Sequence, residues 1–175
     1  AESALAASAA KANVTILGAQ CDVSSEESVQ AMAERIDETF SDKPISLLAC
    51  NAGVGAGGGV LTAVQSDWDF VLGVNLMGPV YCIREFVPRM LEQGAPGSVM
   101  ATASQDGLCA SQGVYGVSKH ACVALMEGLH GEVGGRLTTH VLCPNVVATN
   151  IVTSERNRPD RYGGPRQAHP GAINI

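Results

Sequence analysis

Short apolar runs alternate with longer amphipathic stretches along the chain. Four of these runs are too short for helices and are rich in small or branched apolar residues, which predicts β-strands at residues 14–20, 45–50, 98–102 and 137–143. The runs are continuous rather than alternating between apolar and polar positions. That pattern is typical of strands in a parallel sheet whose two faces are both covered.

Three longer segments carry apolar residues at helical spacing, namely residues 24–40, 66–93 and 114–133. The first is expected to begin at Ser24, because Glu27 follows three residues later and completes a capping box. The second is expected to begin at Ser66, with Asp69 in the reciprocal position. The pair at positions 78–79, Gly-Pro, is expected to perturb this second helix.

The order of these elements is strand, helix, strand, helix, which predicts an α/β fold with a parallel sheet and right-handed crossovers. Ligands of such sheets bind beyond the carboxyl ends of the strands. The loops to inspect therefore begin at Asp22, Asn51, Ala103 and Pro144.

Residues 53–58 read GVGAGG, a literal match to the dinucleotide fingerprint G-x-G-x-x-G. In that fingerprint a helix opens directly out of the turn, whereas here the next helix cap is Ser66. Glycine is also so frequent in this stretch that several spacings are filled by chance. We therefore predict a flexible loop over a ligand site, with a surface loop of no ligand role as the alternative.

Composition limits the classes of function. The 175 residues suffice for one domain, 46% of them are apolar, and the net charge is −6 with no basic stripe. Nucleic acid and anionic membranes are therefore poor candidates for partners. No unbroken apolar run is long enough to span a bilayer, and no basic segment leads the Ala-rich residues 1–10 as in a signal peptide. Six cysteines without a CxxC pair predict buried free thiols in the cytoplasm and no metal site.

Polar residues of specific types follow the predicted strands or lie on the predicted helices. They are Asn51-Ala52-Gly53, Asn75, Ser104, the Y-x-x-x-K pair Tyr115 and Lys119, and PNVVAT at 144–149. In this order and spacing they resemble the short-chain dehydrogenase/reductase family, over residues 14–151. The resemblance implies an NAD(P)-dependent oxidoreductase that interconverts a secondary alcohol and a ketone, with NAD and NADP not distinguished.

Tyr115 and Lys119 lie four residues apart and so share one face of a helix. A free tyrosine has a pKa near 10, and a nearby ammonium group is expected to lower it, so that the pair can exchange a proton with the substrate. The resemblance further implies that Lys119 holds the nicotinamide ribose, Ser104 orients the substrate oxygen and Asn75 holds a water in a proton relay. The alternatives are an ordinary helix pair, a loop hydroxyl at Ser104 with Thr102 as the fallback, and an Asn75 that caps a neighbouring backbone group.

The cofactor contacts are likewise implied by the resemblance. Asp22 and Val23 would contact the adenine, and residues 51–53 (Asn51, Ala52 and Gly53) would pack on the adenosine ribose side. Pro144 and Thr149 would flank the nicotinamide. Asp22 could equally be a strand-end or helix-cap residue.

The family's first two strands, with the turn T-G-x-x-x-G-x-G, and its last strand have no counterpart in residues 1–175. The expected fold is therefore a single, incomplete Rossmann-like doubly wound parallel sheet, which by itself would not bind a dinucleotide tightly. Residues 152–175 are expected to form a polar, mobile substrate loop in which Arg156 and His169 are solvent-exposed, with contact to the substrate as the alternative. The alternative function is a non-catalytic scaffold or an inactive truncated remnant.

The expected partner is a small alcohol or ketone. In the family, the helices predicted at 66–93 and 114–133 pair across a dimer axis, so a homodimer or homotetramer is expected for the full-length protein.

Overall fold

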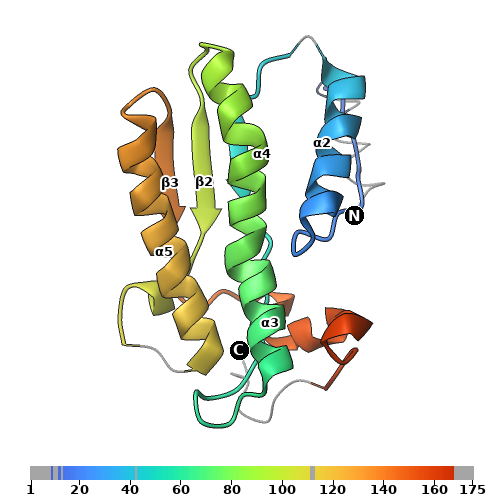
Figure 1. The fold of residues 1–175 in the computed structure, drawn as a ribbon, viewed down its shortest axis with the longest axis vertical. Helices are drawn as coiled ribbons and strands as arrows, with labels where there is room; N and C mark the ends of the chain where they lie inside the picture. The colour runs from blue at the N-terminus through green and yellow to red at the C-terminus, as the bar shows by residue number, and fades with distance from the viewer. Residues whose placement is uncertain (1–8, 10–11, 13, 42, 111–112, 168–175) are drawn as a thin grey trace.

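Three parallel strands form one sheet in this computed structural model, which describes residues 9, 12, 14–41, 43–110 and 113–167 (Figure 1). The strands are β1 (Leu47–Cys50), β2 (Ser98–Thr102) and β3 (Thr138–Leu142), in the order β1-β2-β3. Three of the four predicted strands are thereby confirmed, and the α/β, Rossmann-like class with an incomplete sheet is confirmed with them.

Helices connect and cover the strands. They are α2 (Glu26–Phe40), α3 (Gln65–Leu72), the π-helix η1 (Gly73–Met77), α4 (Gly78–Glu92) and α5 (Gly113–Val133). Three 3₁₀ helices follow strand ends, namely η2 (Gln105–Gly107), η3 (Asn150–Asn157) and η4 (Asp160–Tyr162). Figure 1 shows α4 between α2 and α5, with all three on the side of the sheet that faces the viewer.

Burial within the strands shows which face of the sheet these helices cover. In β2, Val99 and Ala101 are fully buried, whereas Ser98, Met100 and Thr102 on the opposite face are half-buried. The main hydrophobic core therefore lies between one face of the sheet and the helices α2, α4 and α5. The prediction that both faces are covered does not hold among the described residues.

The predicted strand at residues 14–20 is wrong. The segment has no regular structure, and the side chains of Val14 and Ile16 are 57% and 49% exposed. An apolar, β-branched run favours a strand only where a neighbouring strand can accept its hydrogen bonds. No described strand lies beside this segment, so its β-propensity has no partner.

The first helix begins one residue later than predicted. Ser25, not Ser24, is the N-cap of α2, and its Oγ accepts a hydrogen bond of 3.2 Å from the backbone N–H of Ser28. Ser24 instead donates its hydroxyl hydrogen to Asp22 Oδ1 at 2.7 Å. The two adjacent serines are equally good caps by sequence, and the turn made by Asp22 decides between them.

The second helix also begins differently. Val64 is the N-cap of α3, and its backbone N–H donates to Asp67 Oδ2 at 3.1 Å. The predicted cap at Ser66 with Asp69 is therefore wrong, because Asp69 accepts a hydrogen bond from Gln65 on the helix surface instead.

The perturbation expected in this helix is present just before the Gly-Pro pair, as the π-helix η1. Pro79 has no N–H to donate to the carbonyl of Asn75, its partner in a regular α-helix, and a wider turn accommodates the loss. The whole helical run 65–92 is long and apolar enough to cross a membrane by length and composition alone. Because 56% of its most apolar window is buried inside the protein, it has the features of a core helix.

Candidate active site

A cleft of about 970 Å³ opens at the carboxyl ends of the strands, where Figure 1 shows the arrowheads of β2 and β3 pointing toward η3 and η4. The cleft is the location that a parallel sheet predicts for a ligand. Seven of the predicted site residues line it, namely Asn51, Gly53, Ser104, Tyr115, Lys119, Pro144 and Thr149. Asn75 lies buried behind it, whereas Asp22, Val23 and Ala52 are not among the residues that line it.

Lys119 is anchored at the floor of the cleft. Its Nζ donates a hydrogen bond of 2.9 Å to the carbonyl oxygen of Thr102, the last residue of β2, and the residue is only 2% exposed. The ammonium nitrogen lies 5.6 Å from the centroid of the Tyr115 ring. The helical spacing thus brings the two side chains together, as predicted.

The electrostatic expectation for Tyr115 differs from the structure. Burial raises the pKa of Tyr115 above its ordinary value, a hydrogen bond with Ser104 opposes this change, and the carboxylate of Asp106 adds to it. Burial also lowers the pKa of Lys119, against the opposing effect of the nearby thiols of Cys122 and Cys143. The expected lowering of the Tyr115 pKa by the ammonium group is therefore not found in this geometry, where burial is the largest influence on that pKa.

Ser104 occupies the turn that faces Tyr115. It is the N-cap of η2, and its Oγ accepts a hydrogen bond of 3.1 Å from the backbone N–H of Asp106. Gly107 permits this turn to lie against α5, because a Cβ there would be 2.6 Å from the carbonyl oxygen of Lys119. The fallback hydroxyl, that of Thr102, is engaged elsewhere, since it donates to Asn51 Oδ1 at 2.9 Å.

Asn75 projects from η1 toward the loop after β1. Its Oδ1 accepts from the backbone N–H of Val54 at 2.8 Å, and its Nδ2 donates to the Val54 carbonyl at 3.0 Å. A third bond of 2.9 Å runs from Nδ2 to Ser118 Oγ. The side chain is 1% exposed, and it caps a neighbouring backbone group, which was the alternative considered from sequence.

Ser118 is a site residue that the sequence analysis missed. Its hydroxyl donates to the backbone carbonyl of Tyr115 at 2.7 Å while it accepts from Asn75. It therefore connects the π-helix to the first turn of α5. The available signal was its position on α5, one residue before Lys119 and three after Tyr115.

The loop after β1 approaches the reactive side chains closely. A Cβ at Gly53 would lie 3.4 Å from Lys119 Nζ and 3.6 Å from Asn75 Oδ1, so the backbone leaves little room there. Residues 53–59, called here the glycine loop, have no regular structure, and α3 begins only at Gln65. The expectation that this loop does not open directly into a helix is confirmed.

Asp22 and Val23 lie away from the cleft. Asp22 Oδ2 accepts a hydrogen bond of 2.6 Å from Arg161, and the partial burial that would raise its pKa is outweighed by the bonds from Arg161 and Ser24, which lower it. Val23 packs against Gly78, where an added Cβ would be only 2.9 Å away. In the structure Asp22 is thus a turn residue before α2, and its contact with an adenine stays a prediction.

Pro144 and Thr149 begin and end the loop after β3. The Pro144 carbonyl accepts from the backbone N–H of Gln105 at 2.9 Å, which ties this loop to the Ser104 turn. Thr149 Oγ1 accepts from the N–H of Ile151 at 3.4 Å and caps η3. Their contacts with a nicotinamide stay predictions.

The segment after Thr149 is more regular than expected. It forms η3 and η4, and Arg158 within it is 1% exposed, a burial that no pattern in the sequence indicates. Arg156 is exposed, as expected, and its guanidinium donates to backbone oxygens of its own segment. His169 lies outside the described residues.

All six cysteines are free thiols. Among the described residues, no group of three or more His, Cys, Asp or Glu side chains is placed to hold a metal.

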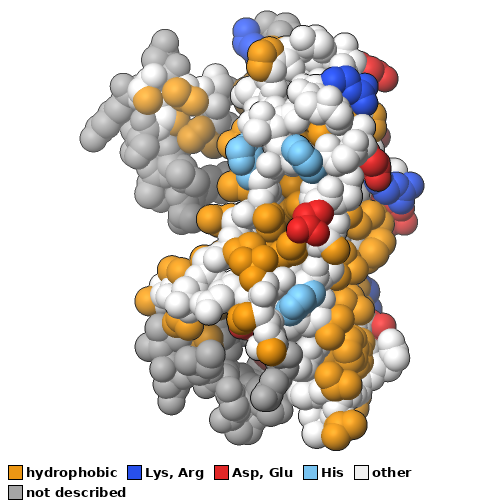
Figure 2. All heavy atoms as spheres, turned by 90° about the vertical axis from the view of Figure 1, so that its left-hand side faces the viewer, with side chains coloured by type: hydrophobic (Ala, Val, Ile, Leu, Met, Phe, Trp, Pro, Cys, Tyr) orange, Lys and Arg blue, Asp and Glu red, His pale blue; other side chains and the backbone are white. Residues whose placement is uncertain are grey.

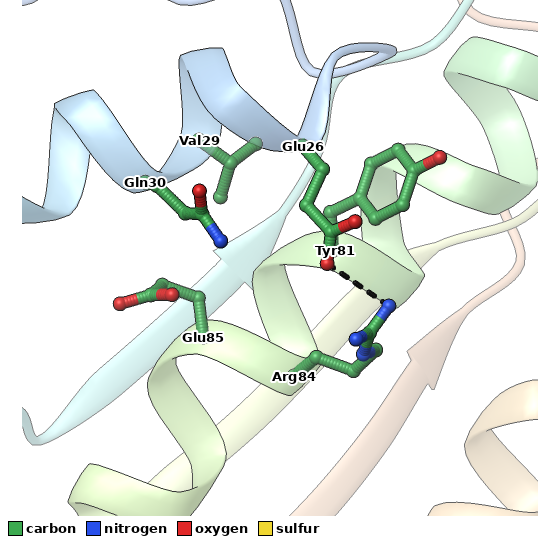
Figure 3. A pocket seen from close by; sticks show the side chains of 6 residues that line it. All are labelled: Glu26, Val29, Gln30, Tyr81, Arg84 and Glu85. Carbon is green, nitrogen blue, oxygen red and sulfur yellow. Dashed lines mark ion pairs between the residues drawn. The ribbon is translucent and has the colours of Figure 1, made fainter.

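A second hollow, of about 110 Å³, lies between α2 and α4 (Figure 3). Glu26 and Arg84 face each other across it with an ion pair of 2.9 Å, in which the side chain of Arg84 is 64% exposed and that of Glu26 38% exposed. It holds no residue of the predicted site, and the larger cleft remains the candidate active site.

Known proteins are similar to this chain in sequence and in fold. The sequence model of the family described as short chain dehydrogenase matches residues 1–160. The C alpha-dehydrogenase of Sphingobium sp. strain SYK-6 is 32% identical over 153 residues, which is 86% of this chain and 50% of that protein. The CLA biosynthesis dehydrogenase/reductase of Lactiplantibacillus plantarum is 31% identical over 155 residues, 86% of this chain and 54% of that protein.

A solved structure agrees in fold. The short chain dehydrogenase/reductase from Burkholderia phymatum, crystallised in complex with NAD, superposes with a TM-score of 0.83 and 38% identity, covering 93% of this chain and 59% of that one. By the coverages of the two sequence relatives given above, this chain spans about half the length of the curated relatives it matches.

Proposed function

We propose, because this chain belongs to the short-chain dehydrogenase/reductase family, that the protein interconverts a secondary alcohol and a ketone with NAD or NADP as its cofactor. The observation that supports this proposal most directly is the arrangement of Tyr115 beside Ser104 and Lys119 at the floor of one cleft. A hydroxyl, a phenol and an ammonium group at one point can hold and protonate a carbonyl oxygen.

The residues present fit one half of a dinucleotide. Gly53 lets the backbone lie close to Lys119, and the cleft is bounded by Asn51 on one side and by Pro144 and Thr149 on the other. In the proposal Lys119 binds the nicotinamide ribose and Thr149 lies near the carboxamide. The nicotinamide, when bound, supplies or accepts the hydride.

Proton transfer is assigned to Tyr115. Because burial and Asp106 raise its pKa, the phenol is protonated at neutral pH, which is the form that donates a proton to a ketone oxygen. Ser104 Oγ accepts from the backbone N–H of Asp106, and its hydroxyl lies within hydrogen-bond reach of Tyr115, so in the proposal its hydrogen turns from the phenol to the substrate oxygen. These two donors would stabilise the negative charge that develops on the oxygen during hydride transfer.

Asn75 is proposed to support this group from behind. Its amide is engaged with Val54 and Ser118, and through Ser118 it fixes the backbone of Tyr115. A proton relay at this position would therefore use groups other than the amide hydrogens of Asn75. One such group is the backbone carbonyl of Asn75, to which Pro79 has no N–H to donate.

Replacement of Tyr115 by phenylalanine tests the proposal. We expect Tyr115→Phe to lower kcat by about 10²–10⁴-fold, the usual contribution of general acid–base catalysis. The fold and the thermal midpoint should change little, because only the hydroxyl is removed. The assay is oxidation or reduction of a panel of secondary alcohols and ketones, followed at the nicotinamide absorbance, with the active form of the protein.

Tyr81→Phe is the matched control, since Tyr81 lies at the hollow between α2 and α4 (Figure 3) and outside the cleft. It should leave turnover unchanged. Full turnover in Tyr115→Phe would refute the role given to Tyr115.

A non-catalytic scaffold is the alternative. A scaffold has no need of a phenol beside a buried ammonium group, whose burial lowers its pKa. The substrate panel distinguishes the enzyme from the scaffold, because dinucleotide binding without turnover of any substrate would favour the scaffold.

Assembly into a homodimer or homotetramer is part of the proposal. The exposed face of α5 carries small or apolar residues, with Val117 45% exposed and open space around Gly128 and Gly131, beside the exposed polar residues His120, Glu127, His130 and Glu132. Figure 2 shows hydrophobic side chains gathered over this side of the molecule, with few charged side chains among them. Such a surface suits close helix packing against a second copy. A monomeric mass in light scattering would count against it.

A further inference from the structure

Residues 150–166, called here the docked segment, are held on α3 by one buried guanidinium. Arg158 Nε donates to Glu155 Oε2 at 2.6 Å, and its Nη2 donates to Glu155 Oε1 at 2.8 Å and to Asp67 Oδ1 at 2.9 Å. Its Nη1 donates to the carbonyl oxygen of Ser66 at 3.0 Å. The guanidinium carbon also lies 4.8 Å from the centroid of the Phe70 ring. Every face of this side chain is thus in contact with the protein.

The charges in this cluster balance. Asp67 and Glu155 supply two carboxylates, and Arg158 and Arg166 supply two guanidinium groups, because Arg166 Nη1 also donates to Asp67 Oδ1 at 2.9 Å. The side chain of Arg158 is 0% exposed and that of Glu155 8% exposed. A buried ion pair is costly to break from one side only, because the remaining charge then has no partner. Removal of Arg158 should therefore release the segment from α3.

The same cluster reaches the glycine loop, which lies against the docked segment at the edge of the cleft. The backbone N–H of Gly57 donates to Glu155 Oε1 at 3.4 Å, and the N–H of Gly55 donates to Ser154 Oγ at 3.2 Å. The contact is close, since a Cβ at Gly55 would be 3.0 Å from the carbonyl oxygen of Ile151. The glycine loop and the docked segment are thereby hydrogen-bonded to each other.

We propose that Arg158 is a positioning residue which, through Asp67 and Glu155, holds the docked segment against the glycine loop and so fixes the width of the cleft on its substrate side. The substrate side of the cleft is defined by the proposed function, on which this part of the inference rests. The coupling between Arg158 and the glycine loop is a property of the chain alone. Gly55, Gly57, Ile151 and Ser154 all line the cleft that Tyr115 faces. A change in docking would therefore alter the room beside the reactive hydroxyl.

Amide hydrogen exchange of the 175-residue chain tests the coupling directly. We expect Arg158→Met to accelerate exchange at Gly55 and Gly57 by at least about tenfold, because their acceptors leave with the segment. The N–H of Val54 is an internal reference, since its acceptor is Asn75 and not the docked segment. It should keep its exchange rate.

Arg89→Met is the matched control variant. Arg89 is also paired with two carboxylates, Asp37 and Glu85, but on the surface of α4 away from the cleft. It should leave exchange at Gly55 and Gly57 unchanged. Equal exchange rates at these two amides in Arg158→Met and the parent chain would overturn the proposal.

A gentler variant covers the case in which Arg158→Met does not fold. Glu155→Gln keeps the shape of the side chain and leaves Arg158 its bond to Asp67, while it weakens the acceptor of Gly57. Exchange should then accelerate at Gly57 more than at Gly55. The absence of any change at Gly57 in this variant would also overturn the proposal.

The kinetic readout uses the active protein. Arg158→Met should raise KM for the alcohol or ketone by at least about fivefold while KM for the dinucleotide changes by less than about twofold. Arg158→Lys should recover part of the loss, because it restores the charge without the bidentate geometry. Equal effects on both KM values would contradict a role on the substrate side. If no substrate is turned over, the proposed function fails. The exchange result still decides whether Arg158 couples the docked segment to the glycine loop.

Discussion

The two walls of the cleft are built in different ways. The wall that carries Tyr115 and Lys119 belongs to α5 and β2, and it is fixed by hydrogen bonds to backbone groups and by apolar packing around Val114 and Cys122, both fully buried. The opposite wall, the docked segment, is built from the 3₁₀ helices η3 and η4 and the turns beside them. It is held by Arg158 and its two carboxylate partners.

The two walls differ in how they would lose their structure. Backbone hydrogen bonds and packing on α5 are spread over many residues and are shared with the main core, so that wall opens only with the domain. The docked segment depends on a few charged groups, so one substitution can release it while the sheet and helices remain folded. The chain thus combines a rigid reactive wall with a wall that can be displaced locally.

The largest effect is expected from Asn75→Ala, which acts on the rigid wall. The substitution leaves the buried N–H and carbonyl of Val54 without partners, at about 1–3 kcal/mol for each group. We therefore expect a loss of about 2–6 kcal/mol in the free energy of unfolding, measured by urea denaturation.

Ser118→Ala is the comparison for this variant. It removes only one of the three bonds that Asn75 makes, so its effect should be clearly smaller. A loss below about 1 kcal/mol in Asn75→Ala would show that this wall does not depend on Asn75.

Acid should act on the docked segment. Burial raises the pKa of Glu155, but the bonds from Arg158 and Gly57 outweigh it and hold the pKa below the ordinary value of 4.5. A lowered pKa means that this contribution to docking is complete above pH 4.5 and is lost as the pH falls through the lower, folded-state pKa. Arg158, Arg166 and Asp67 are the charged groups that face Glu155 in this cluster.

Trp68 provides the measurement, because it is the only tryptophan and lies on α3 beside Phe70. Its emission should be constant from pH 8 to pH 5 and change only below pH 4.5. In Glu155→Gln the group no longer titrates, so the acid transition should shift or broaden. A transition of the parent chain between pH 5 and pH 7 would contradict this account.

The smallest effect is expected at Asp106, which lines the cleft next to the rigid wall. Its carboxylate raises the pKa of Tyr115, since a negative charge disfavours the phenolate. Asp106→Asn should therefore lower the Tyr115 pKa and move the rise of alcohol oxidation with pH to lower pH. The matched change Asp69→Asn, on the surface of α3, should leave the pH–rate profile in place. A shift toward higher pH in Asp106→Asn would reverse the assigned sign.

The rigid wall was largely predictable from sequence. Helical periodicity alone places Tyr115 and Lys119 on one face, and the apolar run at 98–102 matches β2 at both ends. Chain order then brings the loops after three parallel strands to one edge of the sheet. These features depend on residues close together in the sequence or on a general rule of topology.

The displaceable wall was not predictable in the same way. Asp67 and Arg158 meet across 91 positions of sequence, and nothing in either local pattern marks them as partners. Two further features depend on which neighbours the folded chain supplies. They are the burial of Arg158 and the irregular structure of residues 14–20, which were predicted to form a strand.

The sequence by itself determined the order of the three strands and their helices, the family and seven of the residues that share the cleft. Only the tertiary structure decided that Asn75 caps Val54, that the pKa of Tyr115 rises and that an ion cluster joins the docked segment to α3. The reason is physical. Periodicity is a local property of the chain, whereas desolvation and ion pairing depend on distances between residues that only the completed fold sets.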